Sequence, residues 1–169
     1  MPGGRIEPAD HLRRTWRVHR LAEGEGLALH DVWEVETPLA PDVTLAAWLQ
    51  AFRAERRSLP SRALFWVRAV LGRVLGLDRG GTGFVPIYQE PDEQLFRIAN
   101  RTVTGFLHVS LADRRPRLAI YVRPNGRGGR FYMGLIEPFR RWVVYPALLA
   151  AGDRAAYRVN GGRTTPHPS

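Results

Sequence analysis

The stretch GGRFYMGLIEPFRRWVVYPALL, Gly128 to Leu149, decides the fold of this chain. It begins with a glycine turn and continues as the most apolar and most aromatic helical pattern in the sequence. At 100° per residue its apolar side chains share one arc, whereas Glu137 and Arg140 fall outside it. Such a helix has to bury its apolar side, and we expect a β-sheet as its partner. Pro138 lacks an N–H group, which predicts a kink or a restart within the helix.

The residues before this stretch supply a sheet in the right order. Alternating side chains predict a strand over 29–37, with Leu29, Asp31, Trp33 and Val35 on one side. Apolar stripes at helical spacing predict two helices, over 44–57 and 62–76. Turn signals then separate four further strands, at 84–90, 94–101, 103–112 and 116–123. This order is typical of an α+β fold and not of a βαβ one.

The length of 169 residues predicts one domain with a substantial core. We expect an N-terminal arm or short helix over 1–27, a single α+β domain over 28–153 and a flexible tail over 154–169. No apolar segment typical of a signal peptide or of a membrane-spanning helix occurs, so a cytoplasmic location is expected.

The positive charge of the chain comes from arginine alone. The net charge is +9, and every basic residue is an arginine. Clustered arginines would favour a nucleic-acid or anionic-membrane partner, since guanidinium groups bind phosphate bidentately. Here the arginines are spread from Arg5 to Arg163 in short doublets, a distribution that coding bias also produces. The spread disfavours a dedicated nucleic-acid face.

The chain lacks the residues that several kinds of functional site require. The chain has no cysteine, which excludes disulfides, thiolate nucleophiles and zinc–thiolate sites. The Gly80–Gly83 loop is not followed by the Lys-Ser/Thr pair of a phosphate-binding loop. His30, Glu34 and His108 do not converge by spacing alone. Glu34 with Glu36 could form a general acid–base pair, although alternating glutamates are ordinary on the exposed face of an antiparallel strand. We therefore predict no cofactor, no metal and no catalytic residue.

Two runs in the second half of the chain carry a family resemblance. The first is FVPIYQE at 84–90, with Asp92 and Glu93 soon after it. The second is Asn125, then GRFY at 129–132, IEPFRR at 136–141 and Val143. Over about residues 28–152 these runs resemble the sheet-opening segment and the closing motif of the bacterial family called domain of unknown function 2867.

This resemblance implies a helix-grip fold similar to that of START and Bet v 1 proteins (SRPBCC). In that fold a curved antiparallel sheet packs on a long C-terminal helix around an apolar cavity. Members of the family occur alone or appended to nucleotide-binding, reductase-like domains, and no reaction is established for them. Titratable positions of the family are replaced here: Asn100, Thr102 and Thr104 stand for acidic residues and a histidine, and Arg140 stands for a histidine.

The sequence thus predicts a binding module with a small hydrophobic ligand in the cavity between sheet and C-terminal helix. Arg130 is the expected polar anchor, and Glu90 its expected partner. Aromatic side chains are the expected lining: Trp33, Phe106, Tyr121, Phe131, Tyr132, Phe139 and Trp142. One alternative is an enzyme or accessory domain that works with a reductase-like partner. The other is a basic interaction domain for nucleic acid or a membrane surface.

Overall fold

The computed structural model describes residues 15–55, 85–99, 103–139, 142 and 145–161. Five antiparallel strands form one curved sheet in the order β1-β5-β4-β3-β2. Strands β2 to β5 follow one another as a meander, and β1 adds to the outer edge of β5. The strands are β1 (Ala28–Glu34), β2 (Val85–Gln89), β3 (Glu93–Ala99), β4 (Val103–Ala112) and β5 (Arg115–Pro124).

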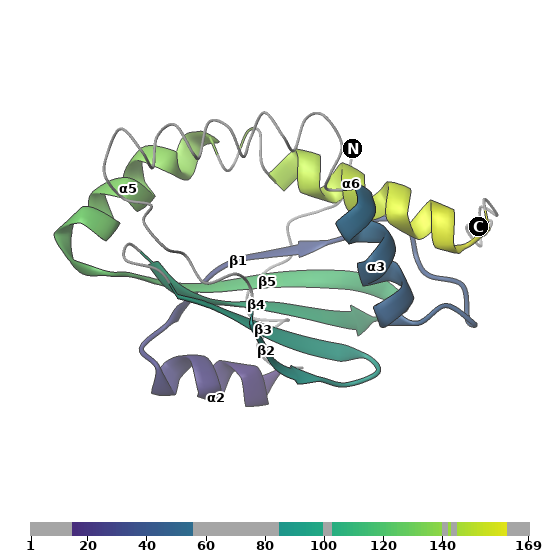
Figure 1. Cartoon of the computed structure of the whole chain (residues 1–169), viewed down its shortest axis with the longest axis horizontal. Helices are drawn as coiled ribbons and strands as arrows, with labels where there is room; N and C mark the ends of the chain where they lie inside the picture. The colour runs from purple at the N-terminus through teal and green to yellow at the C-terminus, as the bar shows by residue number, and fades with distance from the viewer. Residues whose placement is uncertain (1–14, 56–84, 100–102, 140–141, 143–144, 162–169) are drawn as a thin grey trace.

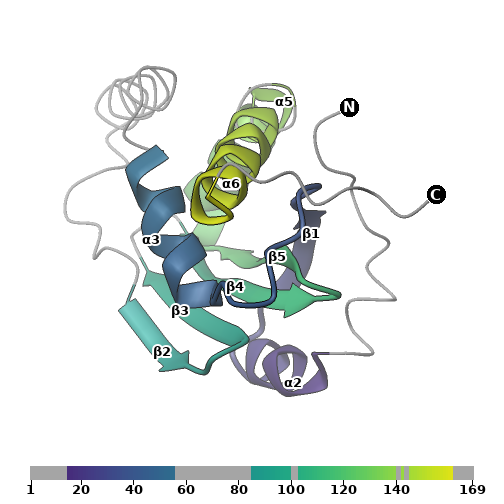
Figure 2. The same cartoon turned by 90° about the vertical axis from the view of Figure 1, so that its right-hand side faces the viewer.

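Helices lie on both faces of this sheet. Helix α2 (Trp16–Gly24) covers one face, which we call the α2 face. Helices α3 (Leu45–Glu55), α5 (Gly126–Phe139) and α6 (Tyr145–Val159) lie over the other, the α5 face (Figures 1 and 2). Among the helices of the described ranges, none has the length and apolar character to cross a bilayer.

The predicted order of elements is confirmed for the elements that the structure describes. All five predicted strands are present within a few residues of their predicted bounds, and the helix predicted over 44–57 is α3. The α+β class follows, since the sheet is antiparallel and the helices lie outside its meander. The helix predicted over 62–76 and the Gly80–Gly83 loop lie outside the described residues.

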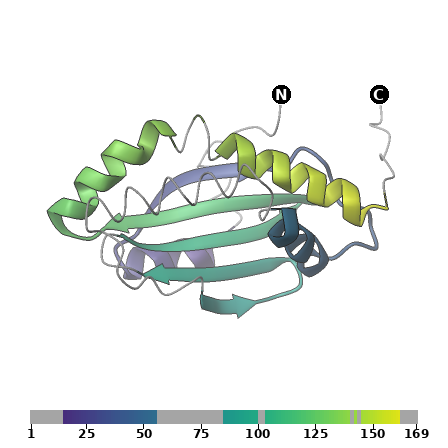
Figure 3. The same ribbon diagram turned by 45° about the horizontal axis from the view of Figure 1, so that its top comes forward.

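The single long C-terminal helix is not confirmed, because the described residues there form two helical segments and residues 140–141 and 143–144 between them lie outside the described part. Helix α5 ends at Phe139, directly after Pro138, and α6 begins at Tyr145. Pro138 lies inside the described part of α5, where its missing N–H removes the hydrogen bond to the carbonyl oxygen of Gly134 and favours a kink. The two helices then lie over different ends of the sheet (Figure 3).

Helix α6 continues beyond residue 153, where we expected a flexible tail. Residues 154–159 are helical, and Ala155 and Ala156 pack into the core. Asn160 follows the helix and is buried; its amide donates to the carbonyl oxygen of Pro38 and accepts from the N–H of Ala40, both at 2.9 Å. These bonds fix the end of α6 to the loop between β1 and α3.

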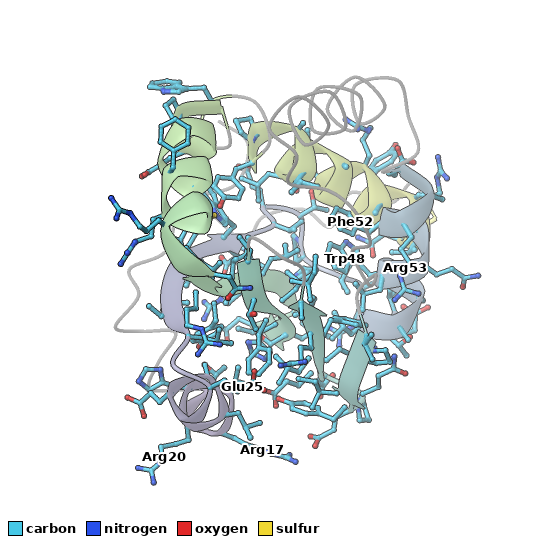
Figure 4. All side chains as sticks on the ribbon, turned by 60° about the vertical axis from the view of Figure 1, so that its left-hand side comes forward. Arg17, Arg20, Glu25, Trp48, Phe52 and Arg53 are labelled. Atoms are coloured by element: carbon cyan, nitrogen blue, oxygen red, sulfur yellow. The ribbon has the colours of Figure 1, made fainter. Side chains whose placement is uncertain are left out.

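Trp48 of α3 is the centre of the larger core. Its ring is fully buried, stacks on Phe52 at 5.0 Å between ring centroids, and donates its indole N–H to the carbonyl oxygen of Gly152 at 3.1 Å. Figure 4 shows both rings on the inner side of α3. The hydrogen bond matters because a buried indole N–H without an acceptor is costly. Gly152 lets α6 come close enough to provide it.

Strand β1 contains a bulge that changes which side chains share a face. The register shifts between Leu29 and Asp31, so the two lie on opposite faces. Leu29 packs with Val32 on the α2 face, whereas Asp31 lies on the α5 face with Trp33. The strict alternation that we expected for 29–35 was therefore wrong at Leu29, because a bulge inserts one unpaired residue into the strand.

The close contact at Gly152 generates a stability prediction. A Cβ at Gly152 would lie 2.8 Å from a methyl carbon of Val35 and 3.4 Å from the Trp48 ring. Both side chains are fully buried, so neither can move away freely. We expect Gly152→Ala to lower the free energy of unfolding by about 1–3 kcal/mol, measured by urea unfolding.

The matched control is Gly134→Ala in α5. A Cβ at Gly134 would point into open space, so alanine should raise helix stability by about 0.5–1 kcal/mol. Equal effects of the two substitutions would contradict the close packing of α6 on Val35.

Candidate functional site

The α5 face of the sheet is incompletely covered at the end where β5 leads into α5. Under α3 and α6, side chains such as Val109 and Leu118 are buried. The next rows of the same face, aligned across β3, β4 and β5 by the register, are only half-buried: Ile98, Leu107, Ile120 and Val122. We call these four the apolar strip. Solvent therefore reaches these side chains in part, on the face of the sheet over which α5 lies (Figures 1 and 3).

Gly105 lies within the apolar strip, between Ile98 and Val122. A Cβ at this position would lie 2.6 Å from the carbonyl oxygen of Tyr121, too close for any side chain without a backbone shift. Position 105 therefore requires glycine.

Polar groups lie at one end of the strip, where β1 meets α6. The Tyr145 hydroxyl donates to Asp31 Oδ2 at 2.8 Å, and both residues are buried. The Trp33 ring packs on Tyr145 with 4.6 Å between centroids, and His30 Nε2 lies 3.6 Å from Asp31 Oδ2. Trp33 Nε1 is buried and has no hydrogen-bond partner among the described residues.

The position of α5 is fixed at its first turn. Asn125 precedes the helix, and its side-chain amide donates to Thr104 Oγ1 on β4 at 3.2 Å. Its backbone carbonyl oxygen accepts the N–H of Gly129 at 3.2 Å, and Gly126 has a φ of +65°, which favours glycine. The asparagine and the glycine step of the closing motif thus set the direction in which α5 leaves the sheet.

The residues of α5 differ in how far they are exposed to solvent. Gly129 is buried and Met133 is half-buried, so this side of the helix faces protein. Arg130 and Phe131 are exposed, Phe131 to 68%. Trp142, beyond the end of α5, is 79% exposed.

The structure divides the predicted lining residues among three environments. Trp33 lies on the α5 face beside Tyr145. Phe106 and Tyr121 lie on the opposite face, packed with Val18 of α2. Arg130, Phe131 and Trp142 are exposed, and the side chains of Tyr132 and Phe139 lie outside the described part of the chain. Asn100, Thr102 and Arg140 also lie outside it.

A second polar group of residues lies on the α2 face. His108 is fully buried, and its Nε2 lies 2.8 Å from Glu93 Oε1, which also accepts the Tyr88 hydroxyl at 2.9 Å. The His108 hydrogen bond lowers the pKa of Glu93 below its usual value, against the opposing effect of burial. Burial, followed by the hydrogen bond to Glu93, raises the pKa of the Tyr88 hydroxyl.

The remaining acidic candidates are engaged in ion pairs. Glu34 bonds Arg117 at 2.6 Å and Arg115 at 3.4 Å and is half-buried, not solvent-facing as we expected. Glu90 pairs with Arg17 at 2.8 Å, not with Arg130 as we expected, because β2 lies beside α2. Within the described ranges, no group of three or more His, Asp and Glu side chains is placed to hold a metal ion.

Sequence reasoning missed both the Asp31–Tyr145 pair and the Glu93–His108 pair, and for the same reason. Each joins residues far apart in the chain: Asp31 and Tyr145 are separated by 114 positions, Glu93 and His108 by 15. A residue pattern within one element cannot reveal such pairs. The only local signal was the predicted hairpin of β3 and β4, which brings Glu93 and His108 onto neighbouring strands.

Comparison with known proteins gives one match. The family model described as "Protein of unknown function (DUF2867)" matches residues 24–147, more than half of the chain. Searches of curated proteins and of solved structures gave no significant match.

The Glu93 cluster generates a prediction about pH. Because the folded-state pKa of Glu93 is lowered, the stability it contributes is present above its unfolded pKa and is lost as pH falls through the folded pKa. Glu93→Gln removes the charge and should lower the free energy of unfolding by about 1–3 kcal/mol at pH 7. The difference from the wild type should shrink in acid, as urea unfolding at several pH values would show.

Asp42→Asn is the control, since Asp42 is an exposed carboxylate. It should change stability little at any pH. A difference between wild type and Glu93→Gln that stays constant from neutral to acid pH would contradict the stabilising role of the Glu93 carboxylate.

Proposed function

The chain belongs to the DUF2867 family, and from this premise we propose that it is a binding domain for a small apolar molecule on the α5 face of the sheet. One observation supports this most: the side chains of the apolar strip are half-buried, whereas Val109 and Leu118 on the same face are buried in the core with α3 and α6. Apolar surface that solvent reaches beneath a covering helix is the usual lining of a ligand site.

The ligand should carry a hydrogen-bond acceptor. Trp33 Nε1 is withdrawn from solvent and has no partner in the described ranges, which costs free energy while no ligand is bound. A carbonyl, ether or hydroxyl oxygen on an apolar molecule would remove that cost. We therefore assign the anchoring role expected of Arg130 to Trp33, since Arg130 is exposed.

We propose a helix-grip arrangement similar to that of START and Bet v 1 proteins for this site. The antiparallel meander followed by helices across one face supports it. In this proposal α6 closes one half of the face and α5 covers the ligand over the other. A cytoplasmic location and a reductase-like partner stay predictions.

Filling the apolar strip tests the proposal. The probe is Prodan, a fluorescent naphthalene ketone that combines an apolar ring system with a carbonyl acceptor. Val122→Phe adds bulk at a half-buried position of the strip and should weaken Prodan binding by about tenfold or more, measured by fluorescence titration. Trp33→Phe keeps a ring but removes the N–H, and should weaken binding by about three- to tenfold.

Val85→Phe is the matched control, because Val85 is an exposed valine on the edge strand β2. It should leave the affinity for Prodan unchanged. Equal weakening by both phenylalanine variants, or no saturable binding by the wild type, would overturn the proposed site. Urea unfolding of each variant separates lost binding from lost stability.

A further inference from the structure

Two aromatic side chains at α5 are exposed to an unusual degree. Phe131 and Trp142 have exposed fractions of 68% and 79%, higher than those of the other large apolar side chains in the described part of the chain. Exposed apolar area costs about 25 cal/mol per Å² relative to burial, so two such rings near each other in sequence favour a partner that covers them.

The same segment is basic. Arg127 and Arg130 are exposed on the first two turns of α5, and Arg127 is one helical turn before Phe131. From Gly126 to Trp142 the sequence contains four arginines and one glutamate. Charge complementarity therefore points to an anionic partner.

The place of α5 in the fold indicates what kind of anionic partner it is. The helix lies at the end of the molecule, beyond the part covered by α3 and α6, with its outer side unobstructed by other described elements (Figure 3). A helix that is exposed at the end of a molecule can contact a broad surface. Single-stranded nucleic acid, in contrast, is usually bound in a basic groove. Aromatic residues beside arginines are also the composition of helices that lie in the interface of a bilayer.

We propose that α5 docks the protein on an anionic lipid surface, with Phe131 and Trp142 inserted at the headgroup level and Arg127 and Arg130 bound to lipid phosphates or carboxylates. Each arginine near an anionic membrane contributes favourably, and each aromatic ring adds apolar contact. Adsorption of this kind needs no helix that crosses the bilayer. The proposal is independent of the ligand site, since it uses the outer side of α5.

Vesicle co-sedimentation of the full chain tests it. The wild type should bind vesicles of phosphatidylcholine with about 30% phosphatidylserine, and bind pure phosphatidylcholine vesicles at least tenfold more weakly. Raising the salt concentration from about 0.05 M to about 0.5 M should weaken binding to the anionic vesicles strongly. The double variant Phe131→Ser/Trp142→Ser, and separately Arg127→Gln/Arg130→Gln, should each reduce the partition coefficient by about tenfold.

Matched controls carry the same changes elsewhere on the surface. Leu21→Ser/Tyr157→Ser removes two exposed apolar side chains outside α5, and Arg20→Gln/Arg53→Gln removes two exposed arginines (Figure 4). Both controls should bind vesicles like the wild type. The proposal is overturned if controls and α5 variants lose binding equally, or if the wild type binds a single-stranded oligonucleotide but no anionic vesicle.

Discussion

The hydrogen bond from the Trp48 indole to the Gly152 carbonyl, inside a closed aromatic core, is the contact on which the rest of the structure depends. It joins α3 and α6, which come from distant parts of the chain, and holds both against one half of the sheet. An indole ring is large enough to fill the space between two helices and a sheet, yet its single N–H has to find an acceptor. The carbonyl of a glycine provides one because no side chain keeps the helices apart.

Because α3 and α6 pack on one half of the α5 face, only the other half of this face remains for α5 to cover. The core under α3 and α6 is built from buried apolar side chains, whereas the part toward α5 contains half-buried apolar residues and the Asp31–Tyr145 pair. The sheet thus combines a fixed scaffold with a less closed region on the same surface. Less closed regions are where ligand sites are usually found in small domains.

Local patterns were enough to predict the elements but not their contacts. Strand alternation and turn residues predicted the meander, but the aromatic stripe of 131–149 does not bury all of its rings, since Phe131 and Trp142 are exposed. The same stripe could not show that the described helical residues form two segments, α5 and α6, since apolar periodicity continues from one to the other. For the candidate site, Trp33 was predicted, but Asp31 and Tyr145 were not, because their pairing depends on how β1 and α6 meet. Phe106 and Tyr121 were assigned to the cavity because aromatic character does not tell which face of a strand is which.

The bulge in β1 has a consequence for comparing this chain with its relatives. The extra residue at His30 reverses the alternation of the strand. Odd-numbered Leu29 before the bulge faces α2, whereas odd-numbered Asp31 and Trp33 after it face the opposite side. A relative with a regular first strand would need one residue fewer at this point to keep the counterparts of Asp31 and Trp33 in place. An alignment of the family should therefore place a single-residue gap at His30, and an ungapped alignment would pair Leu29 with residues of the wrong layer.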